Sequence, residues 1–310
     1  MKPNILLFLT VFLVIGCSSY SDTSTEFDYQ AISALGDTLY APELDPETES
    51  RFKINLEAAK AQYEANPDDA DAIIWYGRRT AYLGNYRKAI EIFSEGVEKH
   101  PKDARMYRHR GHRYITFRKF EQAVEDLEKA AELIKGTKDK IEPDGLPNTR
   151  NMPRSTLHTN IWYHLGLAHY LTGQFEKATG AYRNCMDAST NDDMFVATSY
   201  WLYMTLKRTG KDGLAGEVLE PISREMDLIE NENYHKLLLV FKGNFDEKSL
   251  LENLDTALAN ATIGYGLGNW HYVNGRTERA EEIFRNVYQE NNWAAFGYIA
   301  AEVDLARLEF

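Results

Sequence analysis

The feature that most constrains this chain is a pattern of small and large residues that returns every 34 positions. The matching positions are Gly77, Ala89, Phe93 and Gly96 in one stretch, and Gly111, Ala123, Leu127 and Ala130 in the next. Small residues let two helices approach closely, and a large residue one turn later fills the space beside them. A period of 34 is typical of stacked helix–turn–helix units. The sequence therefore predicts an all-α solenoid.

Six such units can be assigned along the chain. The pattern returns at Gly166, Ala178 and Tyr182, and turn glycines continue the spacing beyond them. The predicted units lie near 70–103, 104–137, 159–192, 196–228, 229–260 and 261–292. Apolar residues at helical spacing also predict capping helices over 51–66 and 293–308. The solenoid is thus expected to span residues 51–310.

The motif within the units resembles that of the tetratricopeptide repeat family. The matching residues are Trp162, Leu165, Gly166, Gly173, Ala178 and Tyr182 in unit three, and Gly77, Gly84, Ala89, Phe93 and Pro101 in unit one. The resemblance implies a right-handed superhelical solenoid. Units four and five match only in spacing and turn, since Tyr203 and Lys236 stand where the family prefers a small residue. A fold of this kind does not specify a ligand.

The N-terminus resembles a bacterial lipoprotein signal peptide over residues 1–16. Lys2 precedes a mainly apolar run of 11 residues, Ile5 to Ile15, which is too short for a transmembrane helix. Gly16 and Cys17 then match a lipobox, with Cys17 as the thiol that accepts acyl chains such as palmitate. We therefore expect an exported, membrane-anchored lipoprotein, in the outer membrane rather than the inner one. An ordinary signal peptide is the alternative.

The segment that follows is predicted to be an acidic tether over residues 17–50, partly disordered. Between positions 21 and 50 there are eight acidic side chains and no Lys or Arg. Such a composition is typical of solvated segments. Ile32, Leu39 and Tyr40 indicate that part of the tether docks on the array.

An insertion separates units two and three, which are 55 residues apart instead of 34. The predicted loop covers residues 136–154 and is rich in turn signals. Its candidate functional residues are Glu142, Asp144, Leu146 and Asn148. Leu146 and Met152 predict that the loop packs back on the array. The loop is either a functional element or a tolerated surface insertion.

Charge is unevenly spread along the chain. The formal net charge of −12 argues against nucleic acid as a partner, yet Pro101 to Phe120 holds seven Lys or Arg and one acid. The family resemblance implies that four positions of each first helix line a concave groove. The candidate partner-binding residues at these positions are Arg78, Arg105, Arg108, His112, Asn160, Tyr163, Tyr170, Tyr200 and Lys207.

A basic, tyrosine-rich groove suits a protein partner or an acidic peptide. Guanidinium groups bind carboxylates bidentately, and tyrosine supplies contact area at low entropic cost. Two alternatives stay open: the arginines are solvated or paired with acids of the next helix, or the acidic tether itself lies in the groove.

The predicted function is a membrane-anchored protein-interaction scaffold of the cell envelope. The alternative is a small-ligand or enzymatic site formed by the unit-two Arg and His residues and the 141–158 loop. No catalytic motif is present, so no enzyme activity, cofactor or metal is expected. The oligomeric state is left open.

Overall fold

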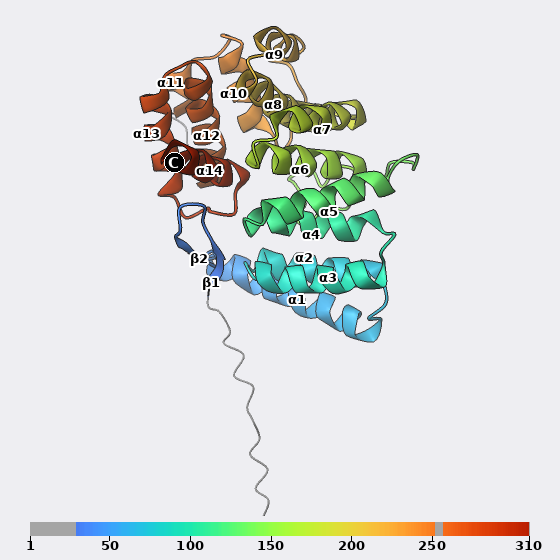
Figure 1. Cartoon of the computed structure of the whole chain (residues 1–310). Helices are drawn as coiled ribbons and strands as arrows, with labels where there is room; N and C mark the ends of the chain where they lie inside the picture. The colour runs from blue at the N-terminus through green and yellow to red at the C-terminus, as the bar shows by residue number, and fades with distance from the viewer. Residues whose placement is uncertain (1–28, 252–256, 310) are drawn as a thin grey trace, which may run out of the picture.

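Stacked helix pairs form the first half of the protein. The computed structural model describes residues 29–251 and 257–309, and the predicted leader and Cys17 lie outside them. The first three pairs are α2 (Ala70–Tyr82) with α3 (Tyr86–Lys99), α4 (Ala104–Thr116) with α5 (Phe120–Leu133), and α6 (Leu157–Leu171) with α7 (Phe175–Ala188). They stack in chain order (Figure 1). The predicted all-α solenoid of helical repeats is confirmed.

The residues of the 34-position period make the contacts within each pair. A Cβ atom added at Gly77 would lie 2.6 Å from the ring of Phe93, and one at Gly166 would lie 2.5 Å from Tyr182. Only glycine therefore allows these helices to pack at this distance. Asp69 and Asp103, also 34 residues apart, both cap the first helix of their unit by accepting from a backbone N–H.

The second half of the array is less regular. It comprises α8 (Asp192–Arg208), α9 (Asp212–Leu219), α10 (Glu232–Phe241), α11 (Glu247–Leu251), α12 (Ala257–Val273), α13 (Thr277–Tyr288) and α14 (Phe296–Glu309). The second helices of units four and five, α9 and α11, are short within the described range. Tyr203, at a position where the family prefers a small residue, is buried and stacks on Phe241 with ring centroids 5.0 Å apart.

The predicted tether is folded wherever the structure describes it. Strands β1 (Tyr29–Ile32) and β2 (Thr38–Tyr40) form an antiparallel hairpin, and α1 runs over Pro46–Ala65. The predicted boundary at residue 50 is therefore wrong. Asp45 caps α1, and the glutamates behind it occupy the first helical turn. Acids are favoured there by the helix dipole, so this acidic run marks a helix start.

The hairpin joins the two ends of the described chain. Ser33 Oγ and Tyr288 OH lie 2.8 Å apart, and Trp293 Nε1 donates to the Tyr40 carbonyl at 2.7 Å. Glu302 of α14 accepts from the Ala34 N–H at 2.7 Å. As Figure 1 shows, the array curls back so that α12–α14 lie beside the earlier helices, with the hairpin below them. The superhelix is closed on itself.

The closed superhelix has a packed interior. Its largest buried side chains include Trp201 and several tyrosines of the first helices. Arg118 of the α4–α5 turn pairs with Glu302 at 2.7 Å, and both side chains are almost fully buried. None of the helices in the described part of the chain has the length and apolar character needed to span a membrane.

Candidate functional site

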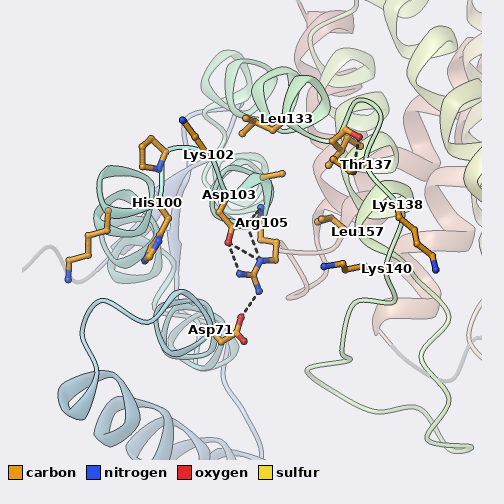
Figure 2. A pocket seen from close by; sticks show the side chains of 14 residues that line it. Asp71, His100, Lys102, Asp103, Arg105, Leu133, Thr137, Lys138, Lys140 and Leu157 are labelled. Atoms are coloured by element: carbon orange, nitrogen blue, oxygen red, sulfur yellow. Dashed lines mark hydrogen bonds and ion pairs between the residues drawn. The ribbon is translucent and has the colours of Figure 1, made fainter.

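A cleft of about 790 Å³ opens where units one and two meet the start of the inserted loop. We call it the outer cleft, and Figure 2 shows its lining. It lies between the N-terminus of α2, the α3–α4 turn, the end of α5 and the start of α6. Its charged residues and histidine are Asp71, Lys99, His100, Lys102, Asp103, Arg105, Lys138 and Lys140. Cationic side chains therefore outnumber carboxylates there.

Arg105 ties two units together at the back of the outer cleft. Its Nη2 lies 2.6 Å from Asp103 Oδ2, and its Nη1 also binds Asp71 of the preceding unit (Figure 2). Lys99 pairs with Glu95 at 2.6 Å. Lys102, Lys138 and Lys140 are exposed and make no ion pair to any residue of the described ranges. Three cationic groups are thus free to meet an outside carboxylate.

The second basic site lies under the inserted loop, on the inward face of α2 and α4. It consists of two cavities, of about 410 and 120 Å³, which share Arg78 and Arg108 in their linings. We call this pair of cavities the inner site. The larger cavity is also lined by the loop residues Glu142, Asp144 and Asn148, and the smaller one by His109, His112 and Arg113.

The inserted loop reaches the inner site through a carboxylate and two backbone carbonyls. Glu142 lies 3.3 Å from Arg108 Nε and 3.2 Å from His109 Nε2, and it accepts from Asn160 Nδ2 at 2.8 Å. Arg78 donates to the Pro143 carbonyl and Arg79 to the Gly145 carbonyl, both at 2.9 Å. These contacts hold the loop against α2 and α4.

The loop packs against the array as predicted, but its apolar residues do not make the docking contacts. Leu146 and Met152 are 55% and 50% exposed. A Cβ at Gly145 would lie 1.6 Å from Tyr82 OH, so this glycine lets the backbone approach α2 directly. Asn148 fixes the rest of the loop by donating to the Met152 carbonyl at 2.7 Å and to Glu230 at 2.5 Å.

The histidines near the inner site are held in the neutral form. Burial lowers the pKa of His164 to about 3, and the charge of Arg108 adds to this effect. Burial also lowers the pKa of His109 and of His112 well below the usual value, assisted by neighbouring arginines. His112 and His164 have ring centroids 4.3 Å apart. The charge of the small cavity therefore comes from arginine alone.

The structure brings together only part of the predicted groove. Arg78, Arg108 and Asn160 meet the predicted loop residues at the inner site, with His112 beside them. Arg105 belongs to the outer cleft. Lys207 lies elsewhere and pairs with Asp212 at 2.6 Å.

The predicted tyrosine surface of the groove is wrong, because these side chains are in the core. Tyr170 and Tyr200 are each 1% exposed and Tyr163 is 8% exposed. Tyr163 accepts from Trp201 Nε1 at 2.8 Å, and the hydroxyls of Tyr170 and Tyr265 lie 2.6 Å apart. The returning C-terminal helices cover them: Phe296 of α14 lies against His112, His164 and Tyr163.

Two groups of site residues did not enter the sequence prediction. Arg113 lies on the same basic helix, next to a predicted position, and lines the small cavity. Lys138 and Lys140 follow the end of α5 and line the outer cleft. The run of lysines at the start of the insertion was the available signal for the second group. Within the described ranges, no three His, Cys, Asp or Glu side chains converge as a metal site would require.

Comparisons with known proteins agree with this architecture. The sequence model of the tetratricopeptide repeat family matches residues 159–192, which form the α6–α7 pair. A tetratricopeptide repeat protein from Parabacteroides merdae has a similar structure, with 15% identity, 84% of this chain and 96% of that chain covered, and a TM-score of 0.50. This likeness shows the fold.

Other solved structures are more distant. YrrB, described as a TPR protein with an unusual peptide-binding site, shares 15% identity over 75% of this chain and 92% of its own, with a TM-score of 0.43. A MamA protein shares 16% identity over 64% of this chain and 89% of its own, with a TM-score of 0.42. No curated protein matches the sequence.

Proposed function

Because this chain has the tetratricopeptide repeat fold, we propose that it is an interaction scaffold that binds an acidic segment of a partner protein in the outer cleft. We further propose that it acts in a bacterial cell envelope, anchored to a membrane by lipid on Cys17. The observation that carries the first proposal is the open cationic cleft in a chain whose formal net charge is −12. Cys17 and the apolar run before it support the second.

The outer cleft has the chemistry of a carboxylate-binding surface. Lys102, Lys138 and Lys140 are unpaired within the described residues, and they surround a floor that includes the buried side chain of Ile134. Lysines at an exposed rim attract an acidic partner over a distance and raise its association rate. The volume of about 790 Å³ falls within the range of ligand clefts, so it suits a short segment rather than a whole domain.

The concave face is a poorer candidate for a partner segment. α14 and the inserted loop already cover the first helices of units one to three, and the tyrosines there have hydrogen-bonding partners in the core. A peptide could enter only by displacing these elements. The outer cleft needs no such rearrangement.

A crosslinked pulldown from intact envelope tests the proposed surface. The full chain carrying Lys102→Gln, Lys138→Gln and Lys140→Gln should lose at least about tenfold of its specific capture, and capture by the unaltered chain should weaken with salt. The control carries the same change at Lys53, Lys60 and Lys88, whose surface ion pairs contribute little to stability. Equal capture by the two variants would contradict the proposal.

The anchoring proposal has a separate test. Cys17→Ala should move the protein from the membrane fraction to the soluble fraction, because the acyl chains that hold it would be missing. Partner capture in the outer cleft should persist in the released protein. A Cys17→Ala protein that stays in the membrane fraction would rule out lipid anchoring at this residue.

A further inference from the structure

The inner site has an end at which positive charge is not compensated. Among the residues that the structure describes, the Arg113 guanidinium makes no hydrogen bond or ion pair, and it lies over the ring of Tyr86, 5.6 Å from the ring centroid. Arg78 and Arg108 line the same small cavity, whose lining includes no Asp or Glu. Burial lowers the pKa of Arg113 to about 10, so its charged form is retained at neutral pH at an energetic cost. An anion placed there would remove that cost.

The small cavity has room for a single small anionic group. Its volume of about 120 Å³ is that of about four water molecules at roughly 30 Å³ each. Phe93 and Tyr82 form aromatic walls. Arg108 Nε is buried without a hydrogen-bond partner, although the Glu142 carboxylate lies 3.3 Å from it at the rim of the cavity. An unsatisfied guanidinium N–H of this kind suits a carboxylate in charge.

The adjoining cavity has the opposite character. It is lined by Asp144 and Glu230 as well as Glu142. Asp144 Oδ2 is buried with no hydrogen-bond partner, and burial raises the pKa of Asp144 and of Glu230. Both carboxylates line the same cavity, and Asp144 adds to the raised pKa of Glu230. A positive group between them would favour the charged form of both.

That positive group is better supplied by an ammonium than by a metal ion. The described residues contain no set of three ligand side chains arranged for a metal. An ammonium needs only hydrogen-bond acceptors, and the carboxylates of Asp144 and Glu230 line this cavity. The larger volume, about 410 Å³, leaves room for a side chain beside the ammonium.

We propose that the inner site binds a free amino acid, with its carboxylate in the arginine cavity and its ammonium beside Asp144 and Glu230. The two cavities share Arg78 and Arg108, so a single small zwitterion can occupy both. The acids of the outer part oppose a second negative charge, which selects against phosphate and dicarboxylates. This site does not depend on the outer cleft, which lies on another face of α4.

Calorimetric titration of the full chain with each of the 20 common amino acids tests the proposal. At least one should bind with 1:1 stoichiometry. For that amino acid, the matched acid without the ammonium and the matched amine without the carboxylate should each bind at least about tenfold more weakly. Inorganic phosphate should not compete.

Two conservative variants locate the bound groups. Arg113→Gln and Asp144→Asn should each weaken binding by at least about tenfold, while circular dichroism shows an unchanged fold. The matched control is Arg150→Gln with Asp227→Asn, an exposed ion pair of 3.0 Å between the inserted loop and the α9–α10 connection, which should bind normally. The Lys102, Lys138 and Lys140 variant should also bind normally, so failure of this site and failure of the outer cleft are distinguishable.

Three results would overturn the proposal. The first is that none of the 20 amino acids binds. The second is that the matched acid binds as tightly as its amino acid and Asp144→Asn has no effect. The third is that phosphate binds in place of the amino acid.

Discussion

The outer cleft and the inner site are both cationic and lie on either side of the first helix of unit two, yet their charges act differently. The outer cleft presents lysines at an exposed rim, where water screens them and side chains move freely. The inner site presents arginines that are buried or half-buried, where water compensates their charge less and a definite partner matters more. Exposure therefore decides the role of a basic residue: attraction of a partner over a distance in one case, recognition of one chemical group in the other.

Among the variants that distinguish the two sites, a change at Glu142 should have the largest effect on stability. Replacing it with Gln leaves Arg108 buried without its counter-charge, which should lower the free energy of unfolding by about 3 kcal/mol. Urea denaturation at pH 7 measures the change. Asp227→Asn removes an exposed carboxylate that pairs with Arg150 of the inserted loop, and it should cost less than about 0.5 kcal/mol. Equal losses would show that Glu142 is not part of a buried pair.

Acid should destabilise the inner site through its histidines. The folded-state pKa of His164 is about 3, below the usual value of 6.5, so the unfolded chain binds this proton more readily. Stability is therefore complete above pH 6.5 and is lost as the pH falls toward 3, by up to about 1.4 kcal/mol per pH unit for this proton.

The variant His164→Gln tests this dependence. Its free energy of unfolding, measured at pH 7 and at pH 5, should fall less than that of the unaltered chain over the same interval. His109 and His112 retain their own contributions, so a shallower slope is expected and not a flat one. A slope identical to that of the unaltered chain would contradict the pKa assigned to His164.

Removing the charge of Arg113 should raise the stability of the protein, whereas removing that of Arg108 should lower it. Because Arg113 is charged, largely enclosed and without an ionic partner in the described structure, Arg113→Met should raise the stability of the ligand-free protein by about 1 kcal/mol. Thermal unfolding in a buffer free of amino acids measures it. A loss of stability as large as that from Arg108→Met would place Arg113 in a compensated ion pair.

The smallest effect is expected in the outer cleft. Lys138→Gln with Lys140→Gln should change the free energy of unfolding by less than about 0.5 kcal/mol, because both side chains are exposed and unpaired within the described residues. Denaturant titration at low and high salt should give the same result. A clear loss of stability would mean that these lysines support the fold, and the contrast with the inner site would disappear.

The repeat architecture could be read from the sequence because its contacts are local. Gly77 meets Phe93, and Gly166 meets Tyr182, over a spacing that the sequence itself displays. The surface of the site could not be read in the same way. Tyr170 occupies the position of a groove residue, but Arg307 of the last helix donates to the carbonyl of its neighbour Leu171, 136 residues away. No local pattern records that α14 returns to this face.

The inserted loop and the acidic run illustrate the same limit. Turn signals correctly marked the loop, while its docking through Glu142 and backbone carbonyls depends on arginines that lie 34 to 66 residues earlier in the sequence. Asp45 and the glutamates behind it looked like solvated charge, although they begin a helix. A helix start and a solvated tether can both be rich in acidic residues. Pro46 was the residue that distinguished the two here.

The contact between the hairpin and the last helices also sets an order of events during synthesis. Tyr29 and Gln30 already have a partner in Arg87. Ser33, however, meets Tyr288, 255 positions later, so this contact of the hairpin forms only when nearly the whole chain has been made. The helix pairs can form one after another as they emerge, whereas closure must come last and over the longest possible loop. A chain that stopped before residue 288 would thus be an open stack of repeats, whose hairpin lacked its contacts to Tyr288, Trp293 and Glu302.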